Sequence, residues 1–234
     1  MYFEVCIDSV EGAIAAEKFG AKRVELCAAL SEGGLSPSAG MIEACAKVLK
    51  NTQLFVMIRP RGGDFTYSES EILVMERDIV AAKQLGADGV VFGILEESGD
   101  IDIQKNMALI EKAFENKLGT TFHRAIDVSL NPIAAIEHLV HIGFDRILTS
   151  GGEAKALQGI GILNKMKEIA QNQIEIMAGS GVDVEQIEKF KAIGMDAVHF
   201  TAKTNLKNTL SLDMGPQTTV DTSKIEAIAN QLNN

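Results

Sequence analysis

The sequence has no tryptophan, only two tyrosines and no run of basic residues, in a chain of 234 residues with a net charge of −10. Nucleic-acid-binding surfaces need clustered Lys and Arg, so nucleic acid is not an expected partner. No apolar run approaches the roughly 18 residues that cross a bilayer. The first predicted strand begins at Tyr2, which leaves no room for a signal segment. We therefore expect a soluble cytoplasmic protein without a membrane partner.

Cysteine is also scarce. The three cysteines, Cys6, Cys27 and Cys45, show no paired spacing. This argues against a disulfide framework and indicates a reducing compartment, in agreement with a cytoplasmic location. Cys45 lies within the apolar helical pattern of residues 41–49 and is expected to be a core residue.

One short phrase occurs four times, at residues 19–24, 85–90, 142–147 and 193–198. Each copy joins a helical pattern to a short apolar strand through a glycine, which favours the left-handed conformation that ends many helices. Other strand-like runs lie between the copies. The chain thus predicts eight strands, near residues 2–7, 22–27, 54–58, 88–93, 119–123, 145–149, 174–178 and 196–200.

Helical patterns fill the intervals between these strands and the C-terminus. Their predicted N-terminal caps are Ser36 before Pro37, Ser68 with Glu71, Asn131 before Pro132, and Asp183 with Gln186. Eight alternating units over residues 1–234 predict a single α/β domain, a (β/α)8 TIM barrel. An open doubly wound sheet is disfavoured because Asp8-Ser-Val-Glu-Gly12 is no glycine-rich nucleotide turn. The long polar loop after the last strand, residues 201–222, is expected to fold over one end of the barrel.

The segment from Arg59 to Phe65, Arg-Pro-Arg-Gly-Gly-Asp-Phe, follows the third predicted strand directly. It brings two guanidiniums to the end of a strand, where barrel proteins carry their sites. Arginine suits forked binding of a carboxylate or phosphate. An internal salt bridge explains Arg59 and Arg61 equally well, and both interpretations stay open at this stage.

Strand alternation predicts that Glu4, Cys6, Glu25 and Cys27 point into the lumen, because the other face must meet apolar helices. Arg59 comes from the neighbouring strand. A buried carboxylate beside a buried guanidinium is the expected pairing, since either charge alone is costly to bury. We therefore expect Glu4 and Glu25 to face Arg59.

Further candidate residues follow the later strands. The loops that contain Ser150 and Gly151, and Gly179, Ser180 and Gly181, could offer backbone N–H groups to an anion. His123 is a candidate general acid or base with Glu25 and Arg59. The other candidate ligand-binding side chains are Arg61, Arg124, Asp127 and His199.

Cys6 and Cys27 raise the question of a metal, because thiolates are ligands for Cu(I). Two strand-end cysteines on neighbouring strands could approach each other. Against this, the chain has no C-x-x-C and no cluster of methionines. Neighbouring barrel strands also contribute to different layers, which could separate the two sulfurs. Buried cysteines often act simply as small apolar residues.

Seven sequence blocks resemble the copper homeostasis protein family CutC. They are Glu4-Val-Cys6, Arg23-Val-Glu-Leu-Cys27, Glu32-Gly-Gly-Leu-Ser-Pro37, Met57-Ile-Arg-Pro-Arg-Gly-Gly-Asp-Phe65, Thr121-Phe-His-Arg-Ala125 with Asp127, Leu148-Thr-Ser-Gly151 and Met177-Ala-Gly-Ser-Gly-Val182. The resemblance implies a barrel fold, a cytoplasmic location and a role in copper tolerance. It places the family's candidate thiol ligands at Cys6 and Cys27. Extra cysteines of other members fall at Ile7 and Thr66 here.

Two functions of different class remain at this stage. The first is copper homeostasis, with Cu(I) bound through Cys6 and Cys27. The alternative is a metal-independent enzyme that acts on a small anionic or polyhydroxy substrate, with Glu25, Arg59 and His123 as catalytic residues. The expected partners are a copper ion or a small anionic ligand, together with further copies of the chain in a homodimer or larger homo-oligomer.

Overall fold

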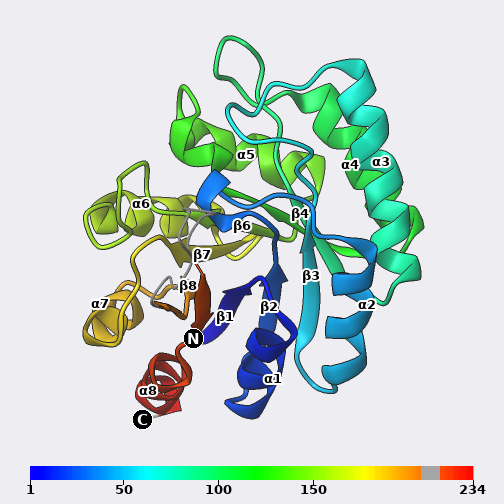
Figure 1. Cartoon of the computed structure of the whole chain (residues 1–234). Coiled ribbons are helices and arrows are strands. Elements are labelled where there is room, and N and C mark those ends of the chain that lie inside the picture. The colour runs from blue at the N-terminus through cyan, green and yellow to red at the C-terminus, as the bar shows by residue number, and fades with distance from the viewer. Residues whose placement is uncertain (207–216, 234) are drawn as a thin grey trace.

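The computed structural model describes residues 1–206 and 217–233, and its eight parallel strands close into a barrel in chain order (Figure 1). The predicted (β/α)8 fold is confirmed, and every strand boundary lies within one residue of its prediction. None of the helices in the described residues is long and apolar enough to cross a membrane. The strands are β1 Tyr2–Ile7, β2 Arg23–Leu26, β3 Gln53–Met57, β4 Gly89–Phe92, β5 Gly119–Phe122, β6 Arg146–Thr149, β7 Glu175–Gly179 and β8 Ala197–Thr201.

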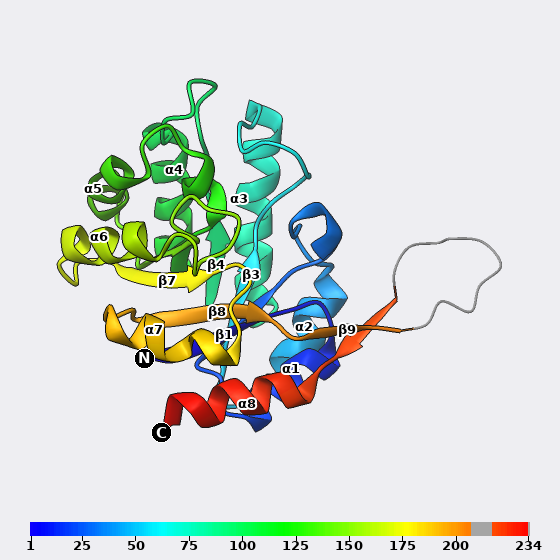
Figure 2. The ribbon, with the colours of Figure 1, turned by 90° about the vertical axis from the view of Figure 1, so that its left-hand side faces the viewer.

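In the described part of the chain eight α-helices surround the barrel, and α8 completes the ring by packing against α1 and α7 (Figure 2). Short 3-10 helices at Leu30–Glu32, Arg124–Val128 and Val184–Gln186 follow strands β2, β5 and β7. The α-helices are α1 Val10–Lys18, α2 Ala39–Val48, α3 Glu69–Gln84, α4 Ile103–Glu115, α5 Pro132–Ile142, α6 Ile160–Ala170, α7 Ile187–Ala192 and α8 Thr222–Asn233.

The four copies of the repeated phrase connect α1, α3, α5 and α7 to the even-numbered strands. Their glycines, at positions 20, 86, 143 and 194, have φ between +70° and +101°, as a left-handed helix end requires. In three copies the phrase contains an aspartate. Asp88, Asp145 and Asp196 each accept a hydrogen bond, at 2.7–2.8 Å, from the backbone N–H of the second residue in the preceding odd-numbered strand. The first copy has Lys22 at this position.

Three of the four predicted residues are helix caps, Ser68, Asn131 and Asp183. Ser68 forms the expected capping box with Glu71, and Asn131 caps α5. The prediction for Ser36 was wrong: Ser38 caps α2, because Ser36 accepts from the N–H of Arg59 instead. Asp183 caps a 3-10 helix through the N–H of Val184, and the N–H of Gln186 donates to the Asp183 carbonyl at 3.0 Å in place of a side-chain capping box.

Apolar side chains divide between two regions. The larger core lies between the outer face of the strands and the helices, and smaller clusters fill the lumen. Phe55 shows how tightly the lumen is packed, because a Cβ added at Gly89 would lie 2.1 Å from its ring. Such close packing between neighbouring strands makes the lumen a core rather than a channel.

The segment after β8 begins and ends in a two-stranded antiparallel sheet, β9 Lys203–Asn205 and β10 Thr218–Val220. This sheet lies beside α1 and extends from the barrel (Figure 2). Lys203 forms an ion pair with Asp8 at the end of β1. The prediction that residues 201–222 fold over one end of the barrel involves residues 207–216, which lie outside the described residues.

Candidate functional site

A cavity of about 460 Å³ opens at the C-terminal ends of the strands. It contains charged, thiol and aromatic side chains, and its walls come from all parts of the sequence. The predicted residues among its walls are Cys6, Glu25, Cys27, Arg59, His123, Arg124, Asp127, Ser180, Gly181 and His199. The other walls are Leu30, Gly33, Met57, Phe65, Val128, Leu148, Phe200 and Thr201.

The two cysteines lie at the inner end of this cavity. Cys6 is level with Glu25 in the strand register, so Cys27 stands two residues nearer the mouth. The two cysteines are therefore staggered along the barrel axis, as expected. Their side chains nevertheless reach towards each other, and the two sulfurs lie 4.0 Å apart. Cys6, Cys27 and a Glu25 carboxylate oxygen all lie within 4.8 Å of one another. A single metal ion could contact these three groups.

The thiols titrate differently because of their mutual contact. Hydrogen bonding with Cys27 and the neighbouring His199 together outweigh the effect of burial and lower the pKa of Cys6 to about 5. The same contact and burial raise the pKa of Cys27 well above its usual value. Burial also raises the pKa of Glu25 well above its usual value. The lowered pKa favours the thiolate at Cys6, the form in which a cysteine binds a soft metal.

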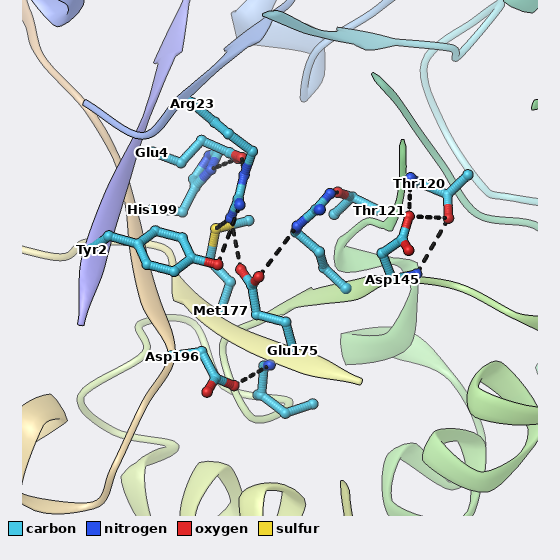
Figure 3. A network of polar contacts seen from close by, with 12 residues as sticks. Tyr2, Glu4, Arg23, Thr120, Thr121, Asp145, Glu175, Met177, Asp196 and His199 are labelled. Atoms are coloured by element: carbon cyan, nitrogen blue, oxygen red, sulfur yellow. Dashed lines mark hydrogen bonds and ion pairs between the residues drawn. The ribbon is translucent and has the colours of Figure 1, made fainter. Parts of the chain in front are cut away.

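Below the cysteines, charges of alternating sign run through the lumen (Figure 3). His199 Nδ1 lies 2.8 Å from Glu4, and Arg23 pairs with Glu4 at 2.8 Å and with Glu175 at 2.7 Å. Burial opposes the charge on Glu4, but His199 and Arg23 lower its pKa to about 2. Burial likewise disfavours the imidazolium of His199, but the neighbouring Glu25, together with Cys6 and Glu4, raises its pKa well above the usual value.

The pairing expected for Arg59 was wrong. Arg23, not Arg59, faces Glu4, because Arg23 lies on the lumen face of β2 whereas Arg59 follows the end of β3. Arg59 instead donates to three backbone carbonyls, those of Glu32, Gly34 and Gly63, at 2.9–3.1 Å. It thereby fastens the loops after β2 and β3 to each other.

Arg61 lies outside this cavity. It forms ion pairs with Asp64 and Glu71 beside a surface groove between α3 and α4, at 2.9 Å and 2.6 Å. Of the two interpretations of Arg61, ligand binding and an internal salt bridge, the structure shows the salt bridge. The Gly62-Gly63 pair lets the loop turn directly after Arg61, with Gly63 at φ +87°.

The loop after β6 binds the carboxylate of Asp127, a residue of the same chain. Asp127 accepts hydrogen bonds from the N–H groups of Ser150 and Gly152 and from the hydroxyls of Thr149 and Ser150. Arg124 completes the set through its Nε at 2.8 Å. Ser150 and Gly151 were predicted to bind a ligand. In the structure the N–H of Ser150 donates to Asp127 and the N–H of Gly151 donates to the Thr149 hydroxyl, and neither residue lines the cavity.

His123 begins the 3-10 turn after β5. Its Nδ1 accepts from the N–H of Ala125 at 3.3 Å, and its ring packs against Phe65 with centroids 4.8 Å apart. Nε2 is buried and has no partner among the described residues. Burial, reinforced by the positive charge of Arg59, lowers the pKa of His123 to about 3. The ring is therefore neutral at physiological pH.

This depressed pKa predicts how stability depends on pH. An unfolded chain protonates His123 below its ordinary pKa of 6.5, whereas the folded chain does so only near 3. The free energy of folding therefore contains no protonation penalty from His123 above pH 6.5. As the pH falls from 6.5 towards 3, protonation of His123 in the unfolded chain progressively destabilises the folded protein. In urea unfolding, the native protein should lose about 2 kcal/mol more than His123→Asn between pH 7 and pH 5. Equal losses in the two proteins would contradict a neutral buried imidazole.

Several residues around the site were missed in the sequence. Arg23 stands two positions before Glu25 on the same face of β2, so alternation alone could have found it. Its partner Glu175, at the start of β7, gave no signal, because a long-range pairing of this kind depends on barrel closure. The apolar walls, such as Phe65 and Leu148, look like any core residue in sequence.

The structure thus defines a (β/α)8 barrel protein with two thiols, an imidazole and a small-molecule-sized cavity at the mouth of the barrel, groups that could contact a soft metal ion or a small ligand. Comparison with known proteins makes this assignment specific. Residues 1–204 match the model of the CutC family, and the chain belongs to that family.

Relatives from distant organisms support the assignment. A CutC family protein of Bacteroides fragilis is 47% identical over 207 residues, covering 88% of this chain and 82% of its own length. The human copper homeostasis protein cutC homolog is 45% identical over 201 residues, covering 86% of this chain and 72% of its own length. The crystal structure of a CutC protein from Streptococcus agalactiae superimposes with a TM-score of 0.78 at 35% identity, covering 86% of this chain and 98% of that one.

Proposed function

We propose that this protein acts in cytoplasmic copper homeostasis by binding one Cu(I) ion between Cys6 and Cys27. The observation that carries the proposal is the 4.0 Å separation of two buried sulfurs at the inner end of an open cavity. Of the two functions compatible with the sequence, copper homeostasis is also the one named in the description of the human relative.

The geometry suits one ion held by both thiols. With metal–sulfur bonds of about 2.3 Å, sulfurs 4.0 Å apart would meet a shared ion at an angle of about 120°. That angle leaves room for a third ligand. Glu25 is close enough to both sulfurs to supply it, and His199 lies 3.6 Å from the Glu25 carboxylate. Cysteine sulfur is a soft ligand that favours Cu(I) over the hard cations Mg²⁺ and Ca²⁺. Binding through both sulfurs would release the proton of Cys27.

The test is a Cu(I) competition titration against a strong chelator, with fully reduced protein under anaerobic conditions. The native protein should retain one equivalent, and Cys6→Ser/Cys27→Ser should retain none. The loss of affinity should exceed the roughly 100-fold effect of removing an outer-shell partner, because both ligands themselves are removed. Thermal unfolding of each protein establishes that the barrel is folded.

Cys45→Ser is the matched control. Cys45 is equally buried but lies on α2, outside the cavity, with its sulfur 3.9 Å from the backbone oxygen of Ser9. Its replacement should leave copper retention unchanged. Copper lost to the chelator by the native protein, or retained by the double variant, would refute the proposed site.

A further inference from the structure

The cavity extends well beyond the two cysteines. Its volume of about 460 Å³ falls within the range of small-molecule sites and far exceeds the space that one ion needs. The outer part is lined by His123 and Arg124 after β5 and by Ser180 and Gly181 after β7. None of these four residues takes part in the proposed copper site.

His123 presents a hydrogen-bond donor without an acceptor. Because Nδ1 accepts from Ala125, the neutral ring must carry its proton on Nε2. That atom has no partner in the described part of the chain, and the residue is only 4% exposed. A buried donor without a partner costs free energy, and native proteins rarely leave one unused. An acceptor on a bound molecule would satisfy it.

The charges around the outer cavity favour an anion. Arg59 has only carbonyl partners, so its charge is not neutralised by any carboxylate among the described residues. Asp127 is paired with Arg124, whose Nη2 donates to Ser150. The Nη1 group of Arg124 has no partner among the described residues, and its side chain is 42% exposed. Arg59 and Arg124 together carry one positive charge more than Asp127 neutralises, and this excess lies in the same cavity wall as the His123 Nε2 donor.

The loop after β7 adds backbone donors. Ser180 and Gly181 both have positive φ, +86° and +64°, and both line the cavity. Within residues 1–206 and 217–233, no acceptor takes the N–H of either residue. Their carbonyl and hydroxyl contacts are internal: Ala156 donates to the Ser180 carbonyl, and the Ser180 hydroxyl donates to the carbonyl of Ala154. Consecutive free N–H groups in such a turn form an anion-binding concavity.

We propose that the outer cavity binds a small organic anion, a carboxylate or a phosphate ester. Its acidic group contacts Arg124 and the N–H groups of Ser180 and Gly181. A hydroxyl or carbonyl oxygen of the same molecule accepts the proton of His123 Nε2. This site is separate from the cysteines and does not depend on copper.

The experiment is a titration of copper-free, nitrogen-15-labelled protein with inorganic phosphate, glycerol 3-phosphate and malate, each followed at the imidazole nitrogens of His123. At least one organic probe should shift the Nε2 signal saturably, with a Kd of about 1 mM or below. His123→Asn keeps an acceptor for Ala125 and removes the Nε2 donor. This variant and Arg124→Gln should each weaken binding about tenfold or more, measured by calorimetry.

Two comparisons separate recognition from folding. His123→Gln, which can place an amide donor near the position of Nε2, should recover binding relative to His123→Asn. Arg61→Gln removes a guanidinium from the same rim but outside the cavity, and should bind as the native protein does. The proposal is overturned if no probe shifts the Nε2 signal saturably at probe concentrations up to roughly 10 mM. It is also overturned if His123→Asn binds like the native protein, or if Arg61→Gln and Arg124→Gln weaken binding equally.

Discussion

Arg23→Met should lower the free energy of unfolding by about 3–5 kcal/mol, the range found when one partner of a buried ion pair is removed. Arg23 is only 2% exposed and neutralises both Glu4 and Glu175. Methionine preserves much of the apolar packing beside Tyr2 but removes the cation that the two carboxylates share, which leaves Glu4 with His199 alone and Glu175 with Arg146 at 3.4 Å. The loss should therefore come from uncompensated charge and not from a cavity.

Urea unfolding at neutral pH measures this effect. Lys47→Met is the matched control, because Lys47 pairs with Glu43 on the exposed surface of α2 at the same 2.8 Å distance. It should change stability by less than about 1 kcal/mol. Adding Glu4→Gln to Arg23→Met should restore part of the loss. A loss below about 1 kcal/mol for Arg23→Met would mean that water or a rearrangement compensates the carboxylates.

Asp127→Ala should destabilise the protein by about 3 kcal/mol or more. The carboxylate accepts from two backbone N–H groups, two hydroxyls and Arg124, and the substitution leaves these donors without their acceptor. Each unsatisfied buried donor costs about 1–3 kcal/mol, although water will reach some of them. The loop after β6 should lose its fixed conformation first, because it has lost its central acceptor.

Thermal or urea unfolding gives the size of the effect, and amide hydrogen exchange at residues 150–152 locates it. Asp64→Ala is the control: Asp64 also pairs with an arginine of a strand-end loop, but it is 67% exposed. Its replacement should cost less than about 1 kcal/mol. Unchanged exchange at residues 150–152 in Asp127→Ala would show that Asp127 does not organise the loop.

The fold was predictable because it depends on local patterns. Short apolar strands, helix caps and the repeated glycine each indicate one element, and eight alternating elements of this length favour a closed barrel. The cap at Ser38 was missed because Ser36, two residues earlier before a proline, is an equally good candidate in sequence. Its hydroxyl is engaged by Arg59, a contact between two loops that no local pattern contains.

The candidate site was only partly predictable, for the same physical reason. Strand alternation placed Cys6, Cys27, Glu4 and Glu25 in the lumen correctly, since that property is local. It did not identify partners. An arginine near the end of a strand can pair with a carboxylate, as Arg61 does, or with carbonyl groups, as Arg59 does. The choice depends on loops that meet only after the barrel has closed.

The repeated glycine and aspartate of the even-numbered strands divide the barrel into four similar quarters, each of two strands and two helices. Internal repeats of this kind are structural units in their own right. The proposed copper ligands both belong to the first quarter, β1 and β2, which is also the one with Lys22 in place of aspartate. The outer-cavity residues belong to the third and fourth. The two proposed sites therefore belong to different quarters, and a chimera that exchanges residues 1–50 with those of a relative would replace the thiol pair while leaving His123, Arg124 and the loop after β7 in place.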